Sequence, residues 1–204
     1  MEKFGLTPIY RALHYKYHHS EMLHGDILNK FVNKLFYEYG HDGVLIIDID
    51  CIPLSRKAID YTFELASNGI LVGNAQRSHH IQNNEHSYAA SSFVCFSEEV
   101  YRELGRPNFL PNKDGDTCEQ LTYNAERQGL KRSFYIPTTY DSKNEIGEDW
   151  DVDGYKYGIG TTFTNYYGVP MSYHLFGSRL NLWNDLFFKK CEEVLNEDSN
   201  LHNM

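Results

Sequence analysis

The sequence has few cysteines, and none of them is spaced as a metal-binding or redox pair. Its four cysteines, Cys51, Cys95, Cys118 and Cys191, lie far apart along the 204 residues. Closely spaced cysteine pairs are typical of zinc and redox sites, and a high cysteine density is typical of small secreted scaffolds. We therefore expect reduced, mostly buried thiols, as in a cytoplasmic protein.

Long apolar runs and an excess of positive charge are also missing. No stretch reaches the roughly 20 apolar residues that a membrane-spanning helix needs, and the first residues lack the basic-then-apolar pattern of a signal peptide. The net charge of −9 disfavours a broad surface for nucleic acid or for anionic lipid. The sequence thus predicts a cytoplasmic protein with no membrane partner, for which a polymeric nucleic acid is a less favoured partner.

Enough apolar material is present for one folded domain spanning residues 1–204, since 41% of the residues are hydrophobic and 15% are aromatic. Helical periodicity over 26–39 is followed by the aliphatic strand 44–47, a helix that Ser55 can cap, and the strand 70–72. This alternation predicts an α/β fold in which crossover helices cover both faces of a sheet. Further strands are expected at 88–96, 133–136 and 171–176, a polar loop at 74–87, and a long loop or β-rich region at 138–168. Helices are expected at 97–105, where Ser97 is the N-terminal cap, at 116–129 and at 182–195.

The most informative segment follows the aliphatic strand. Four aliphatic residues at 44–47, without polar alternation, are typical of a strand covered on both faces, as in a parallel sheet. Asp48 and Asp50 come directly afterwards, and the alternation of side chains along a strand predicts that they point to the same side. Ligands of open α/β sheets bind at the carboxyl ends of strands, where these two residues stand.

Two carboxylates on one side of a strand end are costly to hold together, because like charges repel and burial adds desolvation. A divalent cation removes this cost, and hard oxygen ligands select Mg²⁺ or Mn²⁺, which in turn bind phosphate oxygens. We therefore predict that Asp48 and Asp50 are metal ligands. The alternative is that both residues only solubilise the strand end and begin a turn.

The segment 46–54 resembles the D-x-D region of glycosyltransferases with the GT-A fold, a Rossmann-related α/β fold. In that family an aspartate pair holds Mn²⁺ or Mg²⁺ on the diphosphate of a nucleotide-sugar, and several members add a histidine from a C-terminal H-x-x-G-x-x-K pattern. This chain has His174, Gly177 and Arg179 in the segment HLFGSR, with arginine one position early. The resemblance implies that His174 is a third metal ligand, that Gly177 belongs to the donor-binding segment, and that Arg179 neutralises the departing diphosphate.

The same resemblance implies a nucleotide-diphosphate sugar as donor and leaves the acceptor open. The family generally places a nucleoside-binding β-α-β unit before the D-x-D strand, whereas 47 residues precede Asp48 here. We therefore expect a GT-A-like mixed sheet with a shortened N-terminal nucleotide-binding region, in which residues 6–9 are a candidate remnant strand. His174 also has a simpler interpretation, as a hydrogen-bonded histidine of the core.

A carboxylate near the start of a helix is the candidate catalytic base. Transfer with inversion needs a group that takes the proton of the acceptor, and inverting GT-A enzymes place it near a helix start. Asp116 fits this description. Asp116 and Glu119 also match a capping box, in which both side chains satisfy backbone N–H groups.

Two other functions remain open at this level. Haloacid-dehalogenase-like phosphatases resemble this chain in having D-x-D after a buried strand, with the first aspartate as nucleophile, although Ile52 stands where they have threonine. A transferase-like fold that binds a nucleotide-sugar or glycan without turnover is the non-enzymatic alternative. The N-terminal histidines His14, His18, His19 and His24 are interpreted as solvent-facing.

Overall fold

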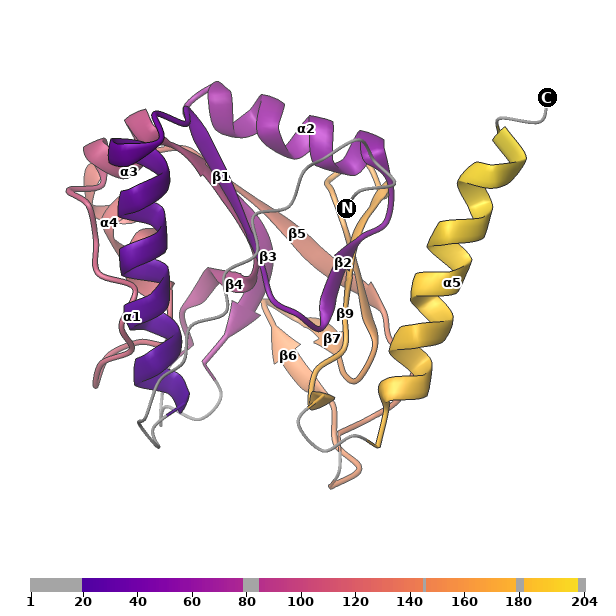
Figure 1. Ribbon diagram of the computed structural model, residues 1–204. Coiled ribbons are helices and arrows are strands. Elements are labelled where there is room, and N and C mark those ends of the chain that lie inside the picture. The colour runs from indigo at the N-terminus through magenta and orange to yellow at the C-terminus, as the bar shows by residue number, and fades with distance from the viewer. Residues whose placement is uncertain (1–19, 79–84, 145, 179–181, 202–204) are drawn as a thin grey trace.

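The computed structural model describes residues 20–78, 85–144, 146–178 and 182–201, and it has a mixed α/β fold (Figure 1). The helices are α1 (Ser20–Asn33), its π-helical continuation η2 (Lys34–Glu38), α2 (Arg56–Ser67), α3 (Glu98–Glu103), α4 (Glu119–Gln128) and α5 (Asn184–Leu201). The strands are β1 (Gly43–Ile47), β2 (Cys51–Pro53), β3 (Leu71–Arg77), β4 (Ser87–Ser97), β5 (Arg132–Thr139), β6 (Trp150–Val152), β7 (Tyr155–Tyr157), β8 (Thr161–Thr164) and β9 (Pro170–His174).

Seven of these strands form one sheet in the order β1-β4-β3-β5-β8-β9-β2, and β6 pairs with β7 in a separate hairpin. Only the β3–β5 pair of this sheet is parallel. Following the pairings, β1, β3, β5 and β9 run in one direction, and β4, β8 and β2 run in the other. The carboxyl ends of four strands therefore meet at the same edge of the sheet, the edge at which α/β proteins generally bind ligands.

Strands β1 and β2 lie at opposite ends of the strand order, yet they are consecutive in the chain. Residues 48–50, which we call the aspartate turn, connect them, and Figure 1 shows β1 and β2 meeting there. The sheet must therefore curl until its two outermost strands converge. This closure brings β4, the neighbour of β1, and β9, the neighbour of β2, to the two sides of one turn.

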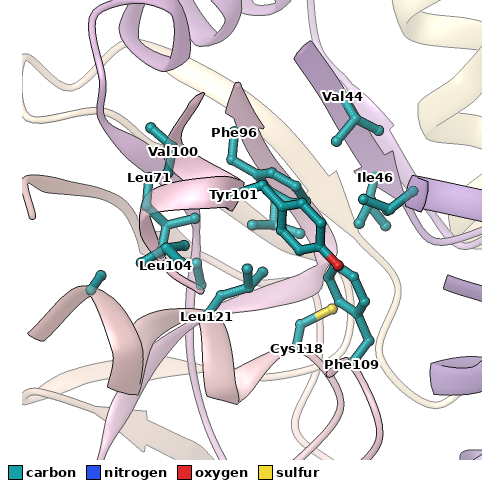
Figure 2. Close-up of a cluster of buried hydrophobic side chains, with 14 of the residues drawn as sticks. Val44, Ile46, Leu71, Phe96, Val100, Tyr101, Leu104, Phe109, Cys118 and Leu121 are labelled. Carbon is teal, nitrogen blue, oxygen red and sulfur yellow. The ribbon is translucent and has the colours of Figure 1, made fainter. Parts of the chain in front are cut away.

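Helices cover both faces of the sheet, as the sequence predicts. On one face, β1 and β4 pack against α3, α4 and the segment from α1 to η2; Figure 2 shows part of this cluster of buried side chains. Val44, Ile46, Leu71, Phe96, Val100, Tyr101, Leu104, Phe109, Cys118 and Leu121 belong to it. On the other face, Ala58 and Ala66 of α2 pack against Phe93 and Cys95 of β4. The alternation along β4 thus serves two cores at once.

Several local expectations are confirmed. Ser55 caps α2, because its side-chain oxygen accepts a hydrogen bond from the backbone N–H of Ala58 at 3.0 Å. Ser97 caps α3 in the same way through Val100. The region 138–168 is β-rich, since it contains β6, β7 and β8.

Other expectations are wrong. The aliphatic run of β1 does not lie in a parallel arrangement, because β1 is an outer strand paired antiparallel with β4, and helices on both faces still bury it. The polar segment from Asn74 continues β3 as far as Arg77, and Asn74 itself is fully buried with its side chain bonded to Ser172. Residues 6–9 lie outside the described residues. Within the described residues, no helix combines the length and apolarity needed to cross a lipid bilayer.

Candidate metal centre

The aspartate turn presents its two carboxylates from a tight reversal rather than from a strand. The backbone N–H of Cys51 donates to the carbonyl of Asp48 at 3.0 Å, and the N–H of Asp48 donates to the carbonyl of Ser92 in β4 at 3.2 Å. The side chain of Ile49 is 96% exposed between them. The predicted strand alternation is therefore wrong at Asp48 and Asp50, although the turn still brings their carboxylates together.

The third predicted ligand arrives from β9. His174 pairs with Cys51 in the register of β2 and β9, directly beside the turn, and the N–H of Leu175 donates to the carbonyl of Asp50 at 2.9 Å. The Nε2 atom of His174 lies 3.3 Å from Oδ1 of Asp50. Ligand atoms of Asp48, Asp50 and His174 all lie within 4.8 Å of one another. Residues 126 positions apart in the sequence thus form one cluster of possible metal ligands.

The turn after β9 explains the glycine of the HLFGSR segment. Gly177 has a φ of +79°, a left-handed conformation that glycine adopts without steric cost. This turn directs Ser178 back toward the centre, where its hydroxyl donates to Oδ2 of Asp50 at 2.6 Å. Ser178 was not singled out from the sequence, although it stands within the motif. Arg179 lies outside the described residues, so its predicted contact with a diphosphate stays a prediction.

The two aspartates differ in their electrostatic surroundings. Burial raises the pKa of Asp48 above its usual 3.8, and this effect outweighs the opposing influence of nearby histidines. Burial also disfavours the charge of Asp50, but the hydrogen bond and charge of His174, together with Ser178, bring its pKa below 3.8. Asp50 is therefore well stabilised as an anion, whereas Asp48 is a carboxylate whose charge the protein alone compensates incompletely.

A second histidine contacts this centre. Nε2 of His24, on α1, lies 3.4 Å from Oδ1 of Asp48, and the His24 side chain is 37% exposed. The interpretation of this histidine as purely solvent-facing is therefore wrong. His14, His18 and His19 lie outside the described residues. Sequence spacing could not have revealed the contact, because it depends on how α1 packs against the loop 109–110.

Asp116, the candidate base, lies in the loop before α4. Helix α4 begins at Glu119, with Cys118 as its N-cap residue, so the helix starts later than predicted. The capping box forms in one direction only, since Glu119 Oε2 accepts from the Asp116 N–H at 2.7 Å. The Asp116 carboxylate instead accepts from the Thr117 N–H at 2.6 Å and from the Tyr88 hydroxyl at 3.2 Å.

Cys118, the N-cap residue of α4, is buried. Burial raises the pKa of the Cys118 thiol well above its usual range, and the negative charges of Asp48 and Asp116 raise it further. Whether Asp116 takes part in catalysis stays a prediction.

Glu119 is the centre of a buried network that the sequence did not reveal. Its side chain is 0% exposed, and it accepts a hydrogen bond from the hydroxyl of Ser78 at 2.6 Å. Nδ1 of His86 lies 2.8 Å from its other oxygen, while Nε2 of His86 lies 3.2 Å from Glu126. The His86 ring stacks on Tyr123 with 3.9 Å between the ring centroids. This Glu119 network ties the loop of Asp116 to the ends of β3 and β4.

The donor set of the metal cluster suits a divalent cation. Two carboxylates and one imidazole are ligands that Mn²⁺ accepts, and carboxylates alone also suit Mg²⁺. The raised pKa of Asp48 indicates negative charge that a cation would compensate. Nδ1 of His174 is buried, and no residue of the described chain offers it a hydrogen bond. The imidazole ring is therefore in a low-dielectric environment, where its electrostatic interaction with a charged partner at Nε2 is stronger than in water.

Comparison with known proteins adds no family assignment. No protein-family model matches the chain, and no curated protein matches it significantly. What can be said of function therefore depends on the site itself.

Proposed function

We propose that the protein is a metal-dependent glycosyltransferase that transfers a sugar from a nucleotide-diphosphate sugar. The single observation that carries the proposal is the convergence of Asp48, Asp50 and His174 at the carboxyl edge of the sheet. The GT-A-like assignment belongs to this proposal and is supported by the mixed α/β fold and by the motif in which the cluster occurs.

Asp48, Asp50 and His174 are the residues that would hold Mn²⁺ or Mg²⁺. When bound, the cation neutralises negative charge on a diphosphate leaving group, which is an electrostatic contribution to the rate. The protein's own part is to fix the ligands: Ser178 and His174 hold Asp50, and the backbone of β4 holds Asp48. Ile49, between the two aspartates in the chain, is exposed.

Asp116 is the candidate base for an inverting transfer. In that reaction an acceptor oxygen bonds to the anomeric carbon, its proton passes to the carboxylate, and the electron pair of the broken C–O bond leaves with the diphosphate. A carboxylate offers about four acceptor positions, and the hydrogen bonds from Thr117 and Tyr88 use two of them. The remaining positions suit an incoming hydroxyl, while the Glu119 network holds the backbone of this loop.

A thermal-shift screen of nucleoside diphosphates and their sugars, with and without Mn²⁺, tests the proposal. A ligand at 100 times its Kd stabilises a protein by about 2.7 kcal/mol, which for a domain of this size raises the midpoint by roughly 5–11 °C. We expect the nucleotide to add this rise only when Mn²⁺ is present, and we expect Asp50→Asn to lose it. Donor consumption should then require the metal.

Other outcomes would contradict the proposed function or favour a different one. Metal-independent turnover of a nucleotide-sugar would contradict the proposal. Hydrolysis of an aryl phosphate that Asp48→Ala abolishes would favour the phosphatase alternative. Binding without product, in a broad screen of acceptors, would favour a non-catalytic binding protein.

A further inference from the structure

The two aspartates of the turn have matching neighbours. Each carboxylate has a histidine near Oδ1, His24 at 3.4 Å from Asp48 and His174 at 3.3 Å from Asp50. Each also has a serine hydroxyl near Oδ2, Ser91 at 3.5 Å from Asp48 and Ser178 at 2.6 Å from Asp50. Both histidines therefore lie beside an Oδ1 atom of the aspartate turn, but of the two only His174 belongs to the cluster of possible metal ligands.

The packing of α1 places His24 beside Asp48. The adjacent Gly25 lies so close to the backbone of the loop before α4 that a Cβ there would be 2.7 Å from Cα of Leu110. One turn along the helix, Oδ1 of Asn29 accepts a hydrogen bond from the N–H of Phe109 at 3.1 Å. Two anchors therefore fix the start of α1 against the loop 109–110, and with it the position of His24.

We propose that His24 is a positioning residue of the metal centre, which holds the carboxylate of Asp48 in the orientation that binds the cation. The inference rests on the proposed metal site, and it adds a residue from α1 that the D-x-D and HLFGSR motifs do not contain. Nε2 of His24 lies at an ion-pair distance of 3.4 Å from Oδ1 of Asp48, and the hydroxyl of Ser91 lies 3.5 Å from Oδ2. Groups that hydrogen-bond a metal-ligating carboxylate orient it, and their loss typically weakens metal binding by about 10–100-fold.

Asp48 depends on a positioning residue more than Asp50 does, because the side-chain contacts of Asp48 are weaker. Asp50 is held by a short hydrogen bond from Ser178, whereas the contacts of Asp48 are both 3.4 Å or longer. A side chain with weaker contacts can leave its binding orientation at a smaller energetic cost. Removal of His24 should therefore affect the binding of the cation more than it affects the fold, since its side chain is partly exposed.

The experiment is a calorimetric titration of the full chain with Mn²⁺ alone. We compare the wild-type protein with His24→Ala, with His24→Gln, which keeps an N–H donor, and with the control His41→Ala. His41 is an exposed histidine that precedes β1, at the end of this strand opposite to Asp48. We expect about 10–100-fold weaker Mn²⁺ binding for His24→Ala, substantial recovery in His24→Gln, and wild-type affinity in the control.

Thermal midpoints without metal establish that each variant is folded. Wild-type affinity in His24→Ala would overturn the role of His24 while leaving the metal site intact. Equal losses in His24→Ala and His24→Gln would overturn the donor role. If the wild-type protein does not bind Mn²⁺, the proposed function fails, and the inference fails with it.

Discussion

Replacing Glu119 with alanine should destabilise the protein strongly, because it removes the acceptor at the centre of the Glu119 network. Donors that face this carboxylate in the described part of the chain include the hydroxyl of Ser78 at 2.6 Å, the backbone N–H of Asp116 at 2.7 Å and Nδ1 of His86 at 2.8 Å. A buried donor left without a partner costs about 1–3 kcal/mol. Ser78 is fully buried, whereas the side chain of His86 is 15% exposed, so that water can partly replace the partner lost by His86.

The expected loss is about 3–5 kcal/mol in the free energy of unfolding, which matches the typical cost of breaking a buried charged pair. For a domain of this size, this corresponds to a drop of roughly 6–20 °C in the thermal midpoint. Urea titration followed by circular dichroism measures the free energy directly. Glu119→Gln keeps one oxygen acceptor and should lose less than Glu119→Ala.

Glu126→Ala is the matched control at the other end of His86. The Glu126 side chain is 37% exposed, and a salt bridge with such exposure contributes about 0–1 kcal/mol. The reasoning is refuted if Glu119→Ala costs under about 1 kcal/mol, the lower limit for one unpaired buried donor. It is also refuted if both variants lose the same stability.

Two further predictions concern the turn and the sheet. Burial raises the pKa of Asp48, so its ionised form opposes folding at neutral pH, and Asp48→Asn should raise the metal-free thermal midpoint at pH 7. This advantage should shrink as the pH falls toward 3.8, because the wild-type carboxyl then becomes neutral as well. A thermal midpoint at pH 7 that is lower for Asp48→Asn than for the wild-type protein would contradict this prediction. A Cβ at Gly73 would lie 2.8 Å from the carbonyl of Phe93, so Gly73→Ala should cost about 1–3 kcal/mol by urea titration. Gly43→Ala is the control, since its nearest neighbour would be 3.6 Å away, and equal losses would refute the close packing.

The sequence predicts local features of the fold where the cause is local. The helix caps at Ser55 and Ser97 follow from side chains that satisfy nearby N–H groups, and the structure contains both. The aliphatic run predicts β1 but not its partner β4, because strand pairing depends on contacts between residues far apart in the sequence. Sequence pattern does not predict the continuation of β3 through Asn74, because a polar residue can be buried when another part of the chain supplies its hydrogen bond.

The same distinction between local features and long-range contacts applies to the candidate site. The cluster of Asp48, Asp50 and His174 was predicted from the D-x-D and HLFGSR segments, and the structure brings these residues together. The predicted reason for the proximity of the two carboxylates is wrong. They come together through a turn between the outermost strands, and not through the alternation of side chains along one strand. The contact of His24 with Asp48 could not be predicted, because it requires the packing of α1 against a loop about 85 residues away.

Anomalous diffraction at the manganese edge tests the central claim most directly. Crystals are soaked with Mn²⁺ and a nucleoside diphosphate, and the account predicts one strong peak bonded to Asp48, Asp50 and His174, with the diphosphate on its open side. A nucleotide bound elsewhere, or a site in which these three side chains hold no manganese at saturating concentration, would contradict it.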